Sequence, residues 1–333
     1  MRRILGRPVA RVEAAPARAI PSSQVYDVVC DDGSRFAVKA ELNAVVGATG
    51  RADLLETEWQ ALSLLAARGC AVVQPVAVDR GARFLVTRWA EGPTLYDACQ
   101  AVAGVDPGVA AACLKRLRAI ERACAADADT HAPHAAPRDD AVLVDEFAAA
   151  FARAREAYYV CLDAGQSLAA RTVRTCDEAW NELWVDLADA PIALGPVDVN
   201  ARNLVLSPDG PVFLDFAAVG WDWPERRAAQ YMTAMGRAGD RGRVACALTP
   251  NAVGMCPDFA ARSTRRLEGH CLLTACLAVA RLLDRAGPDE WPRWPDSGGA
   301  RAESARLTLA RGHVGESAPA TALRAAVADG WRV

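Results

Sequence analysis

Three oxygen-bearing side chains, those of Asp198, Asn203 and Asp215, are close together in the sequence. Carboxylate and amide oxygens are the ligands that Mg²⁺ prefers, and a Mg²⁺ site made of a few such groups leaves room for phosphates. Asp198 stands five residues before Asn203, in a stretch without periodicity that contains Gly195 and Pro196. Taken singly, each polar residue is more typical of a capped or solvated turn. Brought together, the three could hold a hard cation.

The element that must position them is a β-hairpin. Short apolar runs at 204–206 and 212–214 have the character of strands, and residues 207–210 (Ser-Pro-Asp-Gly) form a turn signal between them. Asn203 immediately precedes the first strand, and Asp215 immediately follows the second. Both therefore lie at the open end of the hairpin. Because paired strands are about 5 Å apart, one metal ion could contact both side chains.

The ordered set of Asp198, Asn203, the hairpin and Asp215-Phe216 resembles the catalytic loop and metal-binding motif of the protein-kinase-like superfamily. The most similar branch contains the aminoglycoside phosphotransferases and choline kinases, with the pattern His-x-Asp-x-x-x-x-Asn, hairpin, Asp-Phe or Asp-Trp. The resemblance implies an ATP-dependent phosphotransferase. In it, Asn203 and Asp215 hold Mg²⁺, and Asp198 orients the acceptor hydroxyl and receives its proton.

Lysine is scarce in this chain: of 38 Lys and Arg residues, only Lys39 and Lys115 are lysine. The alternation of Phe36 and Val38 with Ala37 and Lys39 predicts a strand that has Lys39 on the face opposite Val38. A solvated strand lysine is the ordinary alternative. The strand resembles the Val-Ala-Ile-Lys strand of the superfamily, which implies that Lys39 contacts the phosphates of ATP.

A predicted helix at 53–68 offers two acids as the partner of Lys39. Its leucines have helical spacing, and Gly69 after them is typical of a helix end. Glu58 shares the stripe of the leucines, whereas Glu56 lies on a mostly polar face. We therefore expect Glu58 to be the partner, which also matches the Glu-x-x-x-Leu helix of the superfamily.

Residues 87–92 (Thr-Arg-Trp-Ala-Glu-Gly) follow the last strand predicted in the first part of the chain. They resemble the hinge between the two lobes of a kinase. The resemblance implies that Thr87 borders the adenine pocket. It also implies that the backbone of Arg88 and Ala90 hydrogen-bonds the adenine edge.

Three features depart from the family pattern. Pro196 stands at the position of the histidine, segment 14–23 has no glycine where a phosphate-covering loop is expected, and Arg227 replaces an aspartate that braces the catalytic loop. Bracing must therefore differ here. The departures favour an alternative hypothesis, a catalytically weak, kinase-like nucleotide-binding scaffold (a pseudokinase), which the otherwise intact set of polar residues opposes. A protein kinase is disfavoured, since no Ala-Pro-Glu-type segment follows Asp215.

The predicted elements around these motifs are mainly strands first and mainly helices afterwards. The strands are expected at 4–13, 24–31, 34–40, 72–78 and 83–86, and the helices after them at 109–123, 147–164, 172–187 and 259–286, the last being one helix or a helix pair. The fold class is therefore α+β. The resemblance implies a bilobal protein-kinase-like fold with ATP and Mg²⁺ in the cleft. Residues 1–90 form a small N-lobe with an antiparallel sheet and one helix, and residues 91–333 form a larger, mainly helical C-lobe.

Composition narrows the class of protein and its partners. The chain is 52% hydrophobic with a net charge of −3, which favours a packed globule and gives no indication of a nucleic-acid partner. Eleven cysteines without a CxxC pair, and an N-terminus without an apolar signal region, predict a cytoplasmic protein. No apolar run is long enough to span a membrane. The expected partner is a small hydroxylated molecule, and the sequence leaves the oligomeric state open.

The acceptor is left open among an aminoglycoside, a sugar, an amino alcohol and a biosynthetic intermediate. A polycationic aminoglycoside would require a concentration of acids. The candidates, which could equally be ordinary surface charges, are Asp139, Asp140, Asp145, Glu146, Asp222 and Glu225.

Overall fold

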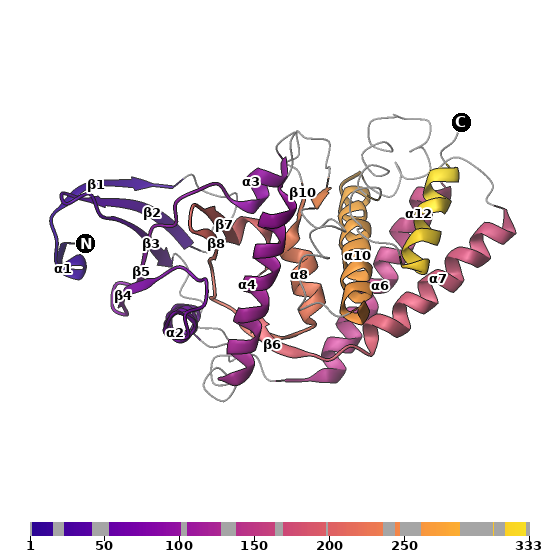
Figure 1. The fold of residues 1–333 in the computed structure, drawn as a ribbon, viewed down its shortest axis with the longest axis horizontal. Helices are drawn as coiled ribbons and strands as arrows, with labels where there is room; N and C mark the ends of the chain where they lie inside the picture. The colour runs from indigo at the N-terminus through magenta and orange to yellow at the C-terminus, as the bar shows by residue number, and fades with distance from the viewer. Residues whose placement is uncertain are drawn as a thin grey trace.

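The structure, a computed structural model, describes residues 2–15, 23–41, 53–100, 105–127, 138–163, 169–197, 199–235, 244–246, 261–286, 309 and 317–330. Figure 1 shows a β-sheet at one end of an elongated molecule and a group of long helices at the other, with helix α4 (Pro107–Ala126) between them. The expected α+β class, with a sheet part followed by a mainly helical part, is confirmed.

The sheet has five antiparallel strands in the order β1-β2-β3-β5-β4. They are β1 (Val9–Ala14), β2 (Ser23–Cys30), β3 (Arg35–Glu41), β4 (Pro75–Asp79) and β5 (Phe84–Arg88). The expectation of a strand from residue 4 was wrong, because Arg2–Leu5 forms the short helix α1 and Gly6, at φ +63°, turns the chain. Strand β4 also begins later than expected, because Val72 forms an isolated bridge with Phe213 of the hairpin.

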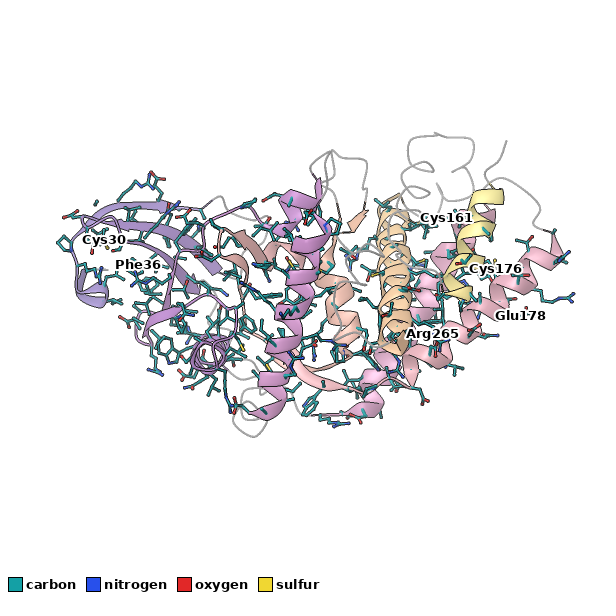
Figure 2. All side chains as sticks on the ribbon, in the orientation of Figure 1. Cys30, Phe36, Cys161, Cys176, Glu178 and Arg265 are labelled. Atoms are coloured by element: carbon teal, nitrogen blue, oxygen red, sulfur yellow. The ribbon has the colours of Figure 1, made fainter. Side chains whose placement is uncertain are left out.

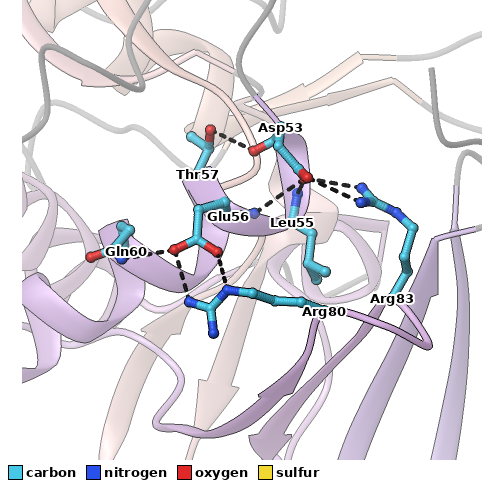
Figure 3. Close-up of polar contacts among 7 residues, drawn as sticks. All are labelled: Asp53, Leu55, Glu56, Thr57, Gln60, Arg80 and Arg83. Carbon is cyan, nitrogen blue, oxygen red and sulfur yellow. Dashed lines mark hydrogen bonds and ion pairs between the residues drawn. The ribbon is translucent and has the colours of Figure 1, made fainter. Parts of the chain in front are cut away.

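Helix α2 (Leu54–Ala67) begins and ends where the sequence predicts. Asp53 caps it, since its side chain accepts hydrogen bonds from the backbone N–H groups of Leu55 and Glu56 at 3.0 and 3.4 Å (Figure 3). Gly69, at φ +69°, ends it. These local signals fix the ends of α2 independently of its tertiary contacts.

The remaining described helices form most of the second part of the chain. They are α3 (Leu95–Gln100), α6 (Asp140–Asp163), α7 (Ala170–Ala188), α8 (Pro224–Met232), α10 (Ala261–Ala286) and α12 (Ala318–Gly330). Helix α6 begins earlier than the predicted residue 147, because Asp139 accepts a hydrogen bond from the N–H of Val142. Helix α10 is one continuous helix.

Three short antiparallel strand pairs lie within this part. The predicted hairpin is confirmed as β7 (Leu204–Ser207) with β8 (Gly210–Phe213). A pair of β6 (Ala193–Pro196) with β9 (Val219–Asp222) was not expected, because residues 194–197 have no strand periodicity. The third pair is β10 (Thr233–Met235) with β11 (Val244–Cys246).

One hydrophobic core joins the sheet part to the helical part. It contains Leu62 of α2, Leu114 of α4 and Phe213 of β8, which are fully buried. Backbone bonds add to this contact: the N–H of Phe213 donates to Ala71 O at 2.9 Å, and the N–H of Val73 donates to Phe213 O at 3.0 Å. The hairpin is thus fastened to the chain between α2 and β4, which fixes its open end relative to the sheet.

Two further hydrophobic clusters stabilise the ends of the molecule. Cys30 and Phe36 are buried at the sheet, and Cys161 and Cys176 are buried among the helices (Figure 2). No disulfide joins the cysteines whose side chains the structure describes. None of the helices in the described ranges combines the length and the apolar character that crossing a bilayer requires.

Candidate active site

Lys39, Glu58 and Asp215 converge from three separate elements. The Lys39 ammonium on β3 donates hydrogen bonds to Glu58 Oε2 of α2 and to Asp215 Oδ1 after β8, both at 2.7 Å. The Glu58 side chain is only 5% exposed, whereas those of Lys39 and Asp215 are 18% and 26% exposed. The buried carboxylate therefore anchors the ammonium, while the other two groups stay within reach of a ligand.

Strand alternation positions the lysine. Val38 is completely buried, so Lys39 lies on the opposite face of β3, as predicted. Burial by itself would lower the pKa of the Lys39 ammonium, but the charges of Glu58 and Asp215 and their hydrogen bonds outweigh it and raise this pKa above its ordinary value. Lys39 is therefore a permanent cation at neutral pH.

The predicted phase of α2 is confirmed. Glu58 is buried and holds Lys39, whereas Glu56 lies on the outer side of the helix. Figure 3 shows the Glu56 carboxylate between Arg80, which donates to it at 2.8 and 3.0 Å, and Gln60, which donates at 2.8 Å. The leucine stripe of the sequence was therefore sufficient to predict which of the two acids contacts Lys39.

Replacing Glu58 should lower turnover, whereas replacing Glu56 should not. Glu58→Gln keeps the shape but removes the counter-charge of Lys39, so turnover with ATP is expected to fall about tenfold or more. Glu56→Gln removes only an exposed ion pair with Arg80, which contributes little to folding, and should leave turnover unchanged. Steady-state rates of both variants test this. Loss of activity in Glu56→Gln alone would contradict the assignment of Glu58.

Asn203 and Asp215 lie at the open end of the hairpin, as predicted. The last paired residues are Leu204 and Phe213, and beyond them the N–H of Leu214 donates to Asn203 O at 2.8 Å. Asp215 has φ +63°, a left-handed conformation that Asp and Asn adopt more readily than most other residues. Their amide and carboxylate oxygens are hard donors suited to Mg²⁺. The described residues contain no cluster of three acidic, His or Cys side chains that could hold a metal.

Asp198 lies outside the described residues, and its neighbours define the loop. Strand β6 ends at Pro196, which is buried, and the N–H of Val197 donates to Ala218 O at 3.2 Å. Asn200 begins a 3₁₀ turn, Ala201–Asn203, by accepting a hydrogen bond from the N–H of Arg202 at 2.9 Å. The loop is therefore held by a strand before Asp198 and by a capped turn after it.

Arg227 joins the two strands that flank the loop and the hairpin. Its guanidinium is completely buried and donates to Ala193 O of β6 at 2.5 Å and to Gly220 O of β9 at 3.0 Å. The two strands that it joins lead into residue 198 and away from Asp215. A Cβ at Gly195 would lie 2.8 Å from the guanidinium, so this glycine makes room for it.

A charged network balances this buried cation. Glu121 of α4 lies 3.7 Å from Arg227 and 2.9 Å from Arg118, which also contacts Glu225 of α8 at 3.2 Å. Burial raises the pKa of the Glu121 carboxyl above its ordinary value, although the two arginines oppose the shift. Two cations and two anions thus share one buried region behind β6 and β9, where losing any one would leave a costly uncompensated charge.

The predicted hinge begins within the end of β5, which includes Thr87 and Arg88. Thr87 is 8% exposed and pairs with Ala37, and the N–H of Trp89 donates to Arg35 O at 3.1 Å. The N–H of Arg88 donates to Gln74 O at 2.9 Å, so a contact of this residue with adenine would have to use its carbonyl. Ala90 is half-buried.

A pocket that the sequence did not indicate opens beside the loop. It has a volume of about 220 Å³ and is bounded by Val199 and Asn200 of the loop, by Tyr96 of α3 and by the side of α10. The sequence of α10 predicted this pocket only weakly, because its polar residues Thr274 and Arg281 share one helical face with apolar Leu277 and Ala278. That mixed face could have been read as a helix surface bordering a cavity.

The acids considered as contacts for a polycationic acceptor do not line this pocket. Several are engaged by arginines: Asp140 by Arg138, Asp222 by Arg226 and Glu225 by Arg118. Asp139 caps α6 instead. They serve structural or surface roles in this fold.

Comparison with known proteins agrees with this architecture. The chain matches the model of the phosphotransferase enzyme family over residues 20–245. A search among curated proteins finds no match. Macrolide 2′-phosphotransferase MphH from Brachybacterium faecium superposes with a TM-score of 0.52 at 11% identity, over 91% of this chain and 93% of that one. A macrolide 2′-phosphotransferase type I superposes with a TM-score of 0.50 at 14% identity, over 89% of this chain and 91% of that one.

A choline/ethanolamine kinase family protein from Mesorhizobium loti gives a TM-score of 0.49 at 15% identity, over 96% of this chain and 92% of that one. At such identities the first two likenesses show the fold, and the protein-kinase-like fold implied by the sequence is confirmed. Since the family model covers more than half of the sequence, this chain belongs to the phosphotransferase enzyme family.

Proposed function

We propose that this protein is an ATP-dependent phosphotransferase that acts on a hydroxyl group of a small molecule. The observation that carries the proposal is the convergence of Lys39, Glu58 and Asp215 at 2.7 Å contacts. A permanent ammonium backed by a buried carboxylate suits a triphosphate, and the oxygen donors of Asn203 and Asp215 suit its Mg²⁺. Membership of the family supports the reaction class, and the macrolide phosphotransferases of similar fold support a small acceptor.

In the proposed reaction, the acceptor oxygen bonds to the γ-phosphorus as the bond to the β–γ bridging oxygen breaks, and ADP leaves with the bonding electrons. Lys39, positioned by Glu58, would contact the phosphates of ATP, and Asn203 and Asp215 would hold Mg²⁺. Asp198 orients the acceptor hydroxyl and takes its proton. Phosphoryl transfer depends mainly on positioning and charge neutralisation, which is what these groups supply.

The hinge would hold the base of the nucleotide. In this proposal Thr87 borders the adenine, the carbonyl of Arg88 accepts a hydrogen bond from it, and the backbone of Ala90 completes the contact. Residues 1–90 then act as the N-lobe over the nucleotide, and residues 91–333 as the C-lobe that carries the loop and the acceptor.

A second candidate is a nucleotide-binding scaffold without turnover. The buried Pro196 at the end of β6 favours it, because a proline replaces the family's histidine two residues before Asp198. The contacts of Arg227 with β6 and β9 argue against it, since the strand that leads into residue 198 remains fastened to its partner. Measured phosphoryl transfer decides between the two.

The two lysines of the chain provide the direct test. Lys39→Ala is expected to lower ATP affinity or turnover by about ten- to a hundredfold, because charge-assisted contacts to phosphate are lost. Lys115→Ala, at an exposed position of α4, should change either quantity by less than about twofold. Isothermal titration with Mg²⁺·ATP and steady-state rates give the comparison, with thermal unfolding as the check on the fold. Equal, small effects would remove Lys39 from the site.

A further inference from the structure

The pocket beside the loop has two facing walls of different origin. One wall is Val199 to Arg202, which follows directly after the proposed base, and the other is the face of α10 that carries Thr274, Ala278 and Arg281. These α10 residues are spaced by four and three positions, so they share one side of the helix. Because one wall follows the proposed base directly in the sequence, we take the pocket as the site of the acceptor, and this inference therefore rests on the proposed function.

The charged residues in the described lining of the pocket are both basic. Arg202 and Arg281 line it, and none of its described lining residues is acidic. Both arginines are exposed, and neither has an ion-pair partner among the residues that the structure describes. Surface arginines elsewhere do lie against carboxylates, for example Arg265 of the same helix, which contacts Asp186 at 3.2 Å. Two guanidinium groups are thus left available at one cavity.

Tyr96 adds an unsatisfied polar group. Its side chain lines the pocket and is nearly buried, yet its hydroxyl has no hydrogen-bond partner within the described part of the chain. The Arg202 guanidinium lies over its ring at 3.8 Å, a cation–π contact that orients the guanidinium fork. An anionic oxygen in the pocket could accept hydrogen bonds from the guanidinium held in this way.

We infer that this pocket selects a compact acceptor alcohol that carries an anionic group, a carboxylate or a phosphate, near its hydroxyl. Arginine is suited to bidentate recognition of both groups. A cavity of about 220 Å³ is smaller than the roughly 300–1,000 Å³ of typical drug-sized sites, so it fits a small metabolite better than a multi-ring antibiotic. A polycationic acceptor would meet two like charges here without a described acid to offset them.

The test uses alcohols that share a carbon frame and differ in charge. One series is glycerate, glycerol and serinol, and a second is glucuronate, glucose and glucosamine; glycerol 3-phosphate separates phosphate from carboxylate recognition. Binding to the full-length protein is measured by titration calorimetry, and phosphoryl transfer with Mg²⁺·ATP is measured on the same panel. Within a series, we expect the anionic member to bind at least about tenfold more tightly than the neutral one, and the cationic member to bind most weakly.

Matched variants of α10 locate the effect. Arg281→Gln should weaken binding of the anionic member about ten- to a hundredfold while Mg²⁺·ATP affinity stays unchanged. Arg265→Gln, which alters a surface arginine of the same helix (labelled in Figure 2), should bind like wild type. Tyr96→Phe keeps the ring beneath Arg202 and should bind the anionic member like wild type, because the Tyr96 hydroxyl is not exposed to the pocket.

Three results would overturn the inference: preference for the neutral or cationic members, unchanged anion binding in Arg281→Gln, or no binding of any anionic member at millimolar concentration. Its failure is distinguishable from failure of the proposed function. Transfer to serinol or glucosamine in preference to the acids would retain the phosphotransferase and reject the anionic acceptor. Anion binding that depends on Arg281 without any phosphoryl transfer would retain the anion site and reject the phosphotransferase.

Discussion

Asp215→Asn is expected to abolish the Mg²⁺-dependent part of ATP binding. The substitution removes the anionic oxygen that a hard cation requires. Even the outer partners of metal ligands typically contribute 10–100-fold to metal affinity, so loss of a direct ligand should cost at least about a hundredfold. The backbone should be unaffected, because Asn also tolerates the left-handed φ of +63° found at this residue. Titration of ATP with and without Mg²⁺ measures the effect.

The same hairpin supplies the control. Asp209 lies in the exposed turn at the other end, and its contact with Arg116 uses the backbone carbonyl, which Asn retains. Asp209→Asn should therefore bind Mg²⁺·ATP like wild type. Lys39 keeps its contact with Glu58 in both variants. If ATP affinity in Asp215→Asn still rises with Mg²⁺ as in wild type, the open end of the hairpin is not the metal site.

The features predictable from sequence were those fixed by local periodicity. The period of two in β3 gave the face of Lys39, and the leucine stripe of α2 separated buried Glu58 from surface Glu56. The turn signal at 207–210 gave the hairpin and hence the neighbourhood of Asn203 and Asp215. In each of these cases a few adjacent residues decide the conformation, so the tertiary structure had only to bring the pieces together.

The pairing of β6 with β9 was not predictable in this way. Each strand has only four residues, β6 contains Gly195 and Pro196, and the two are separated by the entire loop and hairpin. What stabilises the pair is a residue from outside it, Arg227, whose guanidinium reaches backbone carbonyls on both strands. Every residue has a backbone carbonyl, so the sequence does not mark the ones that Arg227 contacts. The sequence therefore showed that an arginine stands where the family pattern has an aspartate, but it could not identify the partners of that arginine.

The pocket beside the loop shows a second limit. Its walls come from α3, the loop, α8 and α10, and no single segment shows a pattern for it. On α10 the hydrophobic residues dominate the periodicity, and they pack in the helical core. Arg281 looks like an ordinary surface residue until the fold places Arg202 and Tyr96 opposite it. The pocket thus arises from residues that only the fold brings together, whereas the contacts among Lys39, Glu58 and Asp215 come from elements with local sequence signals.

Asp198→Asn is expected to separate catalysis from nucleotide binding. The substitution keeps the shape of the side chain but removes its ability to accept a proton. General-base assistance typically contributes 10²–10⁴-fold, or roughly 3–5 kcal/mol of barrier, so turnover should fall by about that factor. ATP affinity and thermal stability should be retained, because the proposed contacts to ATP and Mg²⁺ belong to Lys39, Asn203 and Asp215. ATP affinity and phosphoryl transfer are measured side by side on wild type and variant.

The comparison also decides between the enzyme and the scaffold. An enzyme loses transfer and keeps ATP affinity in Asp198→Asn, whereas a scaffold shows no transfer in wild type and no change in nucleotide binding in the variant. Asp209→Asn again serves as the matched control, since it changes an exposed carboxylate of the adjoining hairpin. Arg227 holds the strands on both sides of the loop through backbone carbonyls, so the variant should not displace them. Wild-type transfer that persists undiminished in Asp198→Asn would exclude Asp198 as the base, and the proton would then have to leave the acceptor by another route.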